Sequence, residues 1–521
     1  MGLARAHAIA LVGVQGHQVE IEVDIENGLV ALLLVGLPDT ALREARDRIR
    51  SAIVNSGERW PQRRVTIGLS PASLPKRGSA FDLGIAVAIL SADSSVPAVH
   101  LAGTVFLGEL GLDGRLRPVP GVLPSVAAAA AAGFSRVVVP PDNAAEAALV
   151  PGMKVVTAPS LRALLLWLRG AVPDDAYSPG VLEALAASGP PGTEPSPGGS
   201  GQARDLADVV GQPVARRAAE ICAAGGHHML LLGPPGVGKT MLAERLPTIM
   251  PALAPAAALE VSSIHSVAGV LSARQPLVTT PPFCAPHHTA TKAAIVGGGS
   301  GIIRPGAASL AHHGCLFLDE APEFDRDVLD ALRQPLESGE VVIARSAMTA
   351  RFPARFTLML AANPCPCAKT AATGAACTCS PLARRRYMAR LSGPLLDRVD
   401  VKVELLPVGR AELLCDRQIA EPSAVVAARV AEARERAEHR LAGTGWRLNG
   451  EIPGSELRRR FRPEARALKP LERAMDLGQI SARGADRVIR MSWTLSDLAG
   501  RNRPGLDEIG CALGLWLGVG L

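Results

Sequence analysis

Residues 229–240 read MLLLGPPGVGKT, an apolar run followed by a glycine-rich loop. The loop matches the pattern GxxxxGK[ST] with Gly233, Pro234, Pro235, Gly236, Val237, Gly238, Lys239 and Thr240. It follows a predicted strand and opens a predicted helix, which is the context that the pattern requires. Such glycines let main-chain N–H groups close around phosphates, while Lys239 reaches the β- and γ-phosphates and Thr240 ligates Mg²⁺. The stretch therefore predicts an α/β fold with a parallel, nucleotide-binding sheet.

Two later apolar runs end in polar side chains of the kind that such a site needs. CLFLDE (315–320) places Asp319 and Glu320 after a predicted strand, and LMLAANP (358–364) places Asn363 after the next. Asp319 would hold the water shell of Mg²⁺, and Glu320 would orient or deprotonate the attacking water. Asn363 would hydrogen-bond the γ-phosphate or that water, although a simple turn-forming Asn-Pro remains an alternative. In this order, the three runs predict ATP hydrolysis.

Composition divides the 521 residues into four segments. Residues 188–201 consist almost entirely of Gly, Pro and Ser, which cannot form a core, so we assign a linker to 171–204. In the first segment, 1–170, predicted strands at 19–25, 31–37, 64–69 and 136–140 alternate with predicted helices at 40–55 and 123–132. The nucleotide-binding segment spans 205–408. Helical periodicity dominates the last segment, 409–521.

The remaining composition predicts a cytoplasmic protein without a membrane span. The first residues lack the pattern of a secretory signal, and the apolar run IGCALGLWLGVGL (509–521) is shorter than the ~20 residues that a spanning helix needs. The net charge of +6 only weakly suggests a polyanionic partner. Nine cysteines without an export signal indicate buried thiols or metal ligands rather than disulfides.

Four of these cysteines, Cys365, Cys367, Cys377 and Cys379, form two CxC pairs separated by nine residues. Such a set can hold one structural, tetrahedral Zn²⁺ and fix the loop after Asn363. Because CxxC is the commoner spacing, a set of thiols without zinc remains the alternative.

Residues 340–360, EVVIARSAMTARFPARFTLML, predict a β-hairpin before the strand that Asn363 follows. Its arginines, Arg345, Arg351 and Arg355, are candidate contacts for DNA phosphates, with an ordinary solvated hairpin as the alternative. The segment APHHTATK adds His287, His288 and Lys292 as further candidates. We expect the histidine pair to be structural or to face DNA, because no carboxylate or cysteine lies beside it at ligand spacing.

Several blocks in one order carry a resemblance over nearly the whole chain. They are VDIENGLVALLLVGLPDTALREARDRIRSAI, SPASLPKRGSAFDLGIA, GPPGVGKTMLAERLP, APHHTATKAAIVGGG, SLAHHGCLFLDEAPEF, ANPCPC, LSGPLLDRVD and SARGADRVIR. With them the chain resembles the ComM/YifB family of magnesium-chelatase-like AAA+ ATPases. The resemblance implies an AAA+ parallel αβα sandwich with a pre-sensor-1 β-hairpin, a C-terminal helical lid and a homohexameric ring with ATP at subunit interfaces.

The resemblance also implies roles for two arginines. Arg398 in SGPLLDR matches the arginine finger offered to the γ-phosphate in the neighbouring subunit, and Arg483 in SARG matches the sensor-2 arginine. Arg487 and Arg490 are the alternatives to Arg483. For each of them an ordinary surface or salt-bridged arginine is the other interpretation. The apolar end 509–521 departs from the polar helix typical of the family, which leaves open whether a last lid helix forms.

The first segment resembles the Lon-protease-like (S5-like) α/β fold, notably in GELGLDGRLRPVPGV. A protease of that type needs a serine activated by a lysine. Ala80 stands at the position of the serine, with Ser79 one place early, and Leu123 stands at the position of the lysine. We therefore expect an assembly or nucleic-acid-binding platform without proteolytic activity.

Three functions fit these patterns in descending order. The resemblance implies a DNA-directed motor that hydrolyses ATP with Mg²⁺ for helicase activity or branch migration in recombination or natural transformation, alongside recombination proteins. The alternative is a chelatase-like motor subunit that remodels a protein partner for metal insertion. An ATP-dependent protease comes third, because both positions of its catalytic pair are changed.

Overall fold

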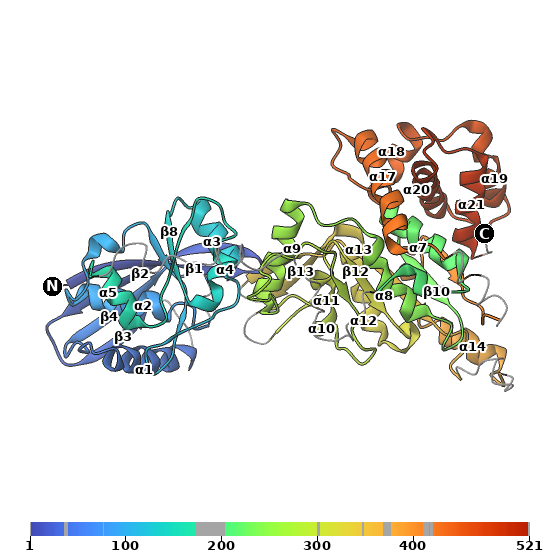
Figure 1. Cartoon of the computed structure of the whole chain (residues 1–521). Helices are drawn as coiled ribbons and strands as arrows, with labels where there is room; N and C mark the ends of the chain where they lie inside the picture. Colours follow the sequence, from blue (N-terminus) through green and yellow to red (C-terminus); the bar gives the residue numbers. More distant parts are fainter. Residues whose placement is uncertain are drawn as a thin grey trace.

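The computed structural model describes residues 2–35, 40–74, 76, 78–171, 204–299, 303–345, 348–367, 377–409, 416 and 420–518. These residues form an N-terminal part (2–171), a central part (204–409) and a C-terminal helical part (420–518), which lies above the right-hand end of the central part in Figure 1. The sheets and helices confirm the predicted mixed α/β class. Of the predicted linker, residues 172–203 lie outside the described residues.

The N-terminal part is built on a seven-stranded mixed sheet of order β3-β4-β2-β1-β5-β8-β9. β1 and β2 pair antiparallel along their whole length, and in β2 Val19, Ile21, Val23 and Ile25 turn one alternating face into the core. β5, β8 and β9 extend the sheet in parallel. The strands of this part are β1 (Gly2–Val12), β2 (Gln15–Glu26), β3 (Ala31–Val35), β4 (Arg64–Ser70), β5 (Thr104–Phe106), β6 (Glu109–Leu110), β7 (Leu116–Arg117), β8 (Arg136–Val139) and β9 (Lys154–Thr157).

Helices cover this sheet, and one of them is entirely buried. Every residue of α2 is buried, as its apolar sequence DLGIAVAILSA requires, and α2 packs on β1 and β2. The helices of this part are α1 (Thr40–Asn55), α2 (Asp82–Ala92), α3 (Val122–Ala131), α4 (Ala144–Ala147) and α5 (Leu161–Leu168).

The central part holds a five-stranded parallel sheet of order β11-β12-β15-β10-β16. Its strands are β10 (Met229–Leu232), β11 (Phe283–Cys284), β12 (Cys315–Leu318), β15 (Thr357–Ala362) and β16 (Val401–Glu404). Because β15 lies between β10 and β12, the carboxyl ends of these three strands share one edge, where ligands of such sheets bind. The glycine-rich loop, Asp319 with Glu320, and Asn363 all follow strands at this edge.

Helices flank the central sheet, and a separate antiparallel hairpin precedes β15. The hairpin strands are β13 (Glu340–Arg345) and β14 (Met348–Pro353), with Val341 opposite Phe352. The helices are α7 (Pro213–Gly225), α8 (Lys239–Ile249), α9 (Pro255–Ala268), α10 (Lys292–Val296), α11 (Ala307–Leu310), α12 (Arg326–Ala331), α13 (Arg333–Ser338), α14 (Pro381–Met388) and α15 (Gly393–Leu396).

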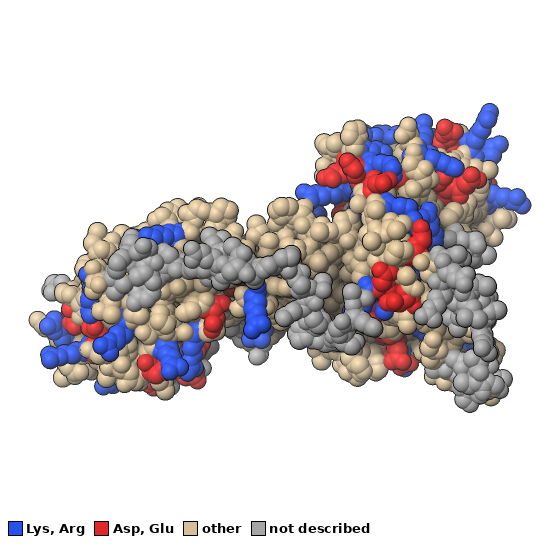
Figure 2. Space-filling model, viewed as in Figure 1, with Lys and Arg blue, Asp and Glu red and all other residues tan. Residues whose placement is uncertain are grey.

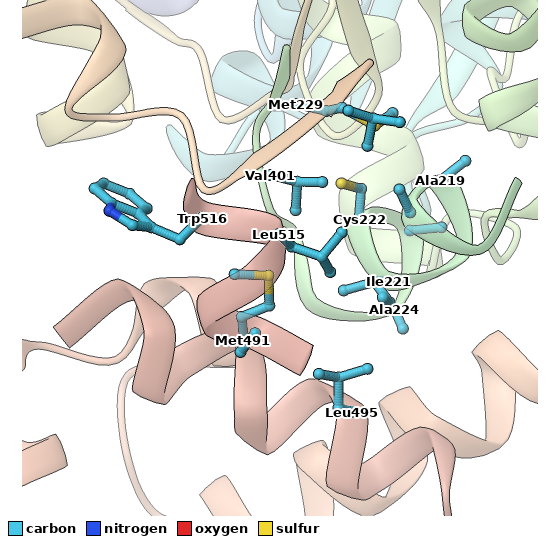
Figure 3. Close-up of a cluster of buried hydrophobic side chains, with 14 of the residues drawn as sticks. Ala219, Ile221, Cys222, Ala224, Met229, Val401, Met491, Leu495, Leu515 and Trp516 are labelled. Atoms are coloured by element: carbon cyan, nitrogen blue, oxygen red, sulfur yellow. The ribbon is translucent and has the colours of Figure 1, made fainter. Parts of the chain in front are cut away.

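The C-terminal helical part shares a core with the central part. Leu515 and Met491 face Cys222 of α7 and Val401 of β16 (Figure 3). The apolar stretch that ends at residue 517 thus forms a helix, α21, that packs against α20, α19 and β16. Among the described helices, none is long and apolar enough to cross a bilayer. The helices are α17 (Ser423–Leu441), α18 (Gly454–Arg459), α19 (Ala465–Asp476), α20 (Ala482–Leu498) and α21 (Leu506–Leu517).

The N-terminal part packs on the hairpin and on α9. Leu11 at the end of β1 meets Phe352 of β14 and Val267 of α9 in a small apolar cluster. Gly13, with φ +66°, lies so close to the hairpin that a Cβ there would come within 2.6 Å of the Arg351 carbonyl oxygen. One face of the hairpin is therefore covered by the N-terminal part of the same chain.

Candidate nucleotide-binding site

The glycine-rich loop runs from the end of β10 into the first turn of α8. Gly236 and Gly238 adopt φ values of +80° and +94°, which only glycine reaches without strain. The main-chain N–H of Gly233 donates to the carbonyl of Ala362 at 3.1 Å, which joins the start of the loop to the end of β15. The loop is thereby fixed against the neighbouring strand with its helix N-terminus facing the site, as phosphate binding requires.

Lys239 is buried and fully hydrogen-bonded. Its ammonium donates to the carbonyls of Gly233 at 2.7 Å and Pro234 at 2.9 Å, and to Oδ1 of Asn363 at 3.0 Å. Burial lowers the pKa of Lys239, and the carboxylates of Asp319 and Glu320 oppose that shift. From the sequence alone, a simple turn is an alternative role for Asn363. The contact places Asn363 at the loop lysine.

Thr240 and Asp319 meet at the mouth of the loop. The Thr240 hydroxyl donates to Oδ2 of Asp319 at 2.7 Å. A hydroxyl in the first turn of α8 and a carboxylate directly after β12 are oxygen donors of the kind that Mg²⁺ prefers. These two residues therefore fit the magnesium that the sequence predicts and would hold it there.

Glu320 has an unusual backbone and an unexpected partner. Its φ of +50° lies in the left-handed region, a conformation that clusters at functional sites. Its own N–H donates to Oδ1 of Asp319 at 2.9 Å, and its Oε2 lies 3.1 Å from Nδ1 of His288. Half-exposed, the Glu320 carboxylate is accessible to a water molecule at this edge.

His288 has a partner that the sequence does not predict. We expected His287 and His288 to be structural or DNA-facing because no carboxylate lies beside them in the sequence. The fold brings Glu320 to His288, while Nδ1 of His287 contacts the Thr289 hydroxyl at 2.9 Å. The sequence does not predict this pair, because His288 and Glu320 are far apart along the chain. They meet only because the segment after β11 lies next to the end of β12 in the fold.

Arg398 belongs to a second cluster of charged groups. Its guanidinium donates to Glu337 and to the Pro394 carbonyl. Burial lowers the pKa of Arg398, with further lowering by the positive charges of Arg487, Arg333 and Arg483. Within the described residues, the recorded partners of this arginine do not include the loop lysine or the two strand-end carboxylates.

The three arginines considered for sensor 2 differ in their surroundings. Arg487 of α20 pairs with Asp400 at 2.6 Å and donates to the Arg398 carbonyl at 3.0 Å. Arg490 donates to the Ile452 carbonyl at 2.6 Å in a buried setting. Of the three, only Arg483 is exposed. It lies close enough to Arg398 for its charge to lower the pKa of Arg398.

The candidate DNA contacts lie at the surface of the central part. Arg345, Arg355 and Lys292 are exposed, and exposed Arg351 pairs with Glu340 at 2.7 Å. Arg351 lies on the opposite face of the hairpin from Phe352, which packs against the N-terminal part. Blue basic side chains also project from the C-terminal helical part, so basic surface is not confined to the hairpin (Figure 2).

The positions that correspond to a protease dyad hold no such pair. Leu123 and Ala80 are apolar, and the Ser79 hydroxyl donates to Glu109. The ammonium of Lys76 donates to the carbonyl of Pro71. These hydrogen bonds of Lys76 and Ser79 therefore go to other groups and do not join the two side chains.

The four cysteines after Asn363 come together in space. Sγ of Cys365 lies 3.2 Å from that of Cys367 and 3.3 Å from that of Cys377. Cys379 completes the set, and all four sulfurs lie within 4.8 Å of one another. Sequence spacing predicted this gathering.

Comparison with known proteins covers all three parts. The family described as "Magnesium chelatase, subunit ChlI" matches residues 205–413, "Subunit ChlI of Mg-chelatase" matches 21–143, and "Magnesium chelatase, subunit ChlI C-terminal" matches 420–515. An uncharacterized protein of Mycobacterium tuberculosis is 51% identical over 98% of both chains.

Two further relatives carry names that appear in the resemblance. Competence protein ComM of Haemophilus influenzae is 41% identical over 99% of this chain and 97% of its own length. The uncharacterized protein YifB of Escherichia coli is 40% identical over 96% of this chain and 94% of its own length. With the described phosphate loop and strand-end carboxylates, these matches show that the chain belongs to the ComM/YifB family of magnesium-chelatase-like AAA+ ATPases.

Proposed function

We propose that the chain is the subunit of a hexameric motor that couples ATP hydrolysis to movement along DNA, as in branch migration during recombination or natural transformation. One observation carries the ATPase mechanism: side chains that follow β12 and β15 contact the glycine-rich loop that follows β10. Lys239 contacts Asn363, and Thr240 contacts Asp319. The family membership supports ATP and Mg²⁺ as the cofactors.

In this mechanism each residue of the edge has one task. The loop N–H groups and Lys239 bind the phosphates, and Asn363 orients the lysine. Thr240 and Asp319 hold Mg²⁺, which when bound neutralises phosphate charge. An Oε atom of Glu320 accepts the proton of the attacking water.

The placement of the arginines supports assembly. The described contacts of Lys239, Asp319, Glu320 and Asn363 include no arginine. Transition-state charge at the γ-phosphate needs such a cation in many ATPases. We infer that Arg398 and exposed Arg483 serve the site of a neighbouring subunit, so that two chains complete one site.

The DNA assignment rests on the exposed arginines of the hairpin and on the relative named as a competence protein. Phosphate contacts by Arg345 and Arg351 would bind DNA without reading its bases. A chelatase-like motor remains the second candidate, because the matching family is described by a magnesium chelatase subunit.

The deciding experiment is the steady-state ATPase rate with and without single-stranded and forked DNA at two salt concentrations. We expect stimulation by DNA that weakens at the higher salt, because phosphate contacts release counterions. Arg351→Ala should need more DNA for half-maximal stimulation and keep its basal rate. Arg459→Ala, at an exposed position on α18, is the matched control. Turnover that ignores DNA would favour the chelatase-like motor, and no turnover would contradict the ATPase assignment.

A further inference from the structure

The loop between Asn363 and α14 contains a compact set of four free thiols. Three of the distances between sulfur atoms in this set are 3.2, 3.3 and 3.5 Å, and no pair exceeds 4.8 Å. Two short segments supply the set: Cys365 with Cys367, and Cys377 with Cys379. The two segments lie side by side, because the sulfur of Cys377 is close to those of Cys365 and Cys367. Four sulfurs within this distance of one another can all ligate a single ion.

The size of the set fits one tetrahedral ion. A Zn–S bond of about 2.3 Å gives edges of about 3.8 Å between the sulfurs of a tetrahedral site. The three sulfur–sulfur distances of 3.2 to 3.5 Å are close to this tetrahedral value of about 3.8 Å. None of the four cysteines forms a disulfide. Four thiolates also leave no open position on the ion, which is the property of a structural site.

A second candidate metal set in the described residues does not pass the same test. Glu260, His312 and His313 also gather their donor atoms within 4.8 Å. However, Nδ1 of His312 accepts the main-chain N–H of Arg355 at 2.9 Å, so in the neutral ring Nε2 carries the proton. A protonated nitrogen has no lone pair for a metal, which leaves that set with two ligands.

We propose that Cys365, Cys367, Cys377 and Cys379 bind one structural Zn²⁺ that fixes the loop after Asn363. Each thiol releases its proton when the ion binds, so the complex carries a net negative charge. Arg384, Arg385 and Arg386 follow in α14 within one helical turn of each other. Their positive charges favour a negatively charged complex at the start of this helix.

The proposed ion joins two segments that both reach the nucleotide site. On one side, Asn363 lies two residues before Cys365 and contacts Lys239. On the other side, α14 carries buried Tyr387, whose hydroxyl receives a main-chain hydrogen bond from Asn363. The ion therefore positions Asn363 through Cys365 on one side and through Tyr387 of α14 on the other, and it acts through Asn363 rather than on the nucleotide.

Metal analysis of the purified full-length chain tests the proposal without nucleotide or DNA. We expect one zinc per chain by mass spectrometry. Titration with a mercurial thiol reagent should release that zinc as the thiols react, which a metal-sensitive dye records. Zinc at the level of the buffer blank, iron in its place, or thiols oxidised to disulfides would each overturn the proposal.

Variants then locate the ion. Cys365→Ser and Cys377→Ser should each lower bound zinc by about tenfold or more, because each removes one of four ligands. Cys284→Ser, outside the set, and Glu260→Gln, in the second candidate set, should keep one zinc per chain. If the cysteine variants do not fold, cobalt exchange into the native chain decides: a thiolate charge-transfer band supports the site, and its absence overturns it.

Discussion

Nδ1 of His288 lies 3.1 Å from Oε2 of Glu320, which links the segment after β11 to the end of β12. Glu320 sits in the left-handed backbone region, and its carboxylate is half-exposed. A carboxylate at such a position has several accessible rotamers unless a neighbour restricts them. We infer that His288 positions the Glu320 carboxylate for the attacking water.

His288→Ala should therefore lower kcat for ATP about tenfold and leave KM nearly unchanged, because positioning acts on the chemical step. The matched control is His287→Ala, since the His287 ring lies next to that of His288, with ring centroids 4.1 Å apart, but hydrogen-bonds to Thr289. Steady-state kinetics of both variants decides. Equal losses in the two variants, or a rise in KM alone, would remove the positioning role.

Variants at Lys239 and at Glu320 should separate nucleotide binding from hydrolysis. Lys239→Ala removes three hydrogen bonds in the loop and the phosphate cation, so we expect no measurable nucleotide binding. Glu320→Gln keeps the loop intact and removes the proton acceptor, so it should bind ATP with turnover lowered about 100-fold or more. A fluorescent nucleotide measures binding, and phosphate release measures turnover. Normal turnover in Glu320→Gln would exclude this residue as the base.

Arg398 should act across an interface. In the described chain it pairs with Glu337 and not with the loop. Arg398→Ala is expected to lose turnover, and mixing it with Lys239→Ala subunits should restore part of the rate, because mixed interfaces combine an intact loop with an intact arginine. Glu337→Gln, which removes the partner of Arg398 but keeps the cation, is the control. A mixed assembly without any recovery would contradict action in trans.

The sequence predicted the parts of the site that depend on local pattern. The apolar run before the loop, the strand ending at Asp319 and the strand ending at Asn363 were identifiable because buried parallel strands are short and continuously apolar. The spacing of the cysteines also predicted their gathering. These features are encoded by neighbours along the chain.

Contacts between distant segments could not be predicted in this way. The pair of His288 and Glu320, and the packing of Leu11 on Phe352, depend on how separate elements dock. The sequence predicts no strand at residues 2–12, where β1 lies. The sequence leaves the last helix open because the apolar end at 509–521 departs from the polar helix typical of the family, and the shared core around Leu515 explains that apolar composition.

Acid should weaken the central part through His228. Burial lowers the pKa of His228 to about 4, and its Nδ1 accepts the N–H of Leu358 at 3.0 Å, as a neutral ring can. Among the charged groups around it, Asp400 opposes the shift and Arg487 adds to it. The unfolded side chain has an ordinary pKa near 6.5, so between about pH 6.5 and 4 the unfolded chain binds more protons.

Stability is therefore expected to fall as the pH drops through that window, by up to about 3 kcal/mol, and to be insensitive to this group above it. His228→Asn retains an acceptor for Leu358 but does not titrate. Unfolding midpoints of both proteins between pH 4 and 7 measure the effect. The variant should show a shallower acid dependence, and identical slopes would rule out His228 as the group.

The last helix should be required for stability of the shared core. Leu515 of α21 is 1% exposed and packs with Cys222 and Val401, whereas Leu506 at the start of the same helix is 57% exposed. Leu515→Ala leaves a cavity and should lower the free energy of unfolding by about 3 kcal/mol, while Leu506→Ala should change it by less than about 0.5 kcal/mol. Denaturant unfolding of both variants compares them directly. α21 contacts both β16 and α20. A large loss of stability in Leu515→Ala would therefore also show that the helical part unfolds together with the central sheet. Equal small effects in the two variants would show that α21 contributes little to the shared core.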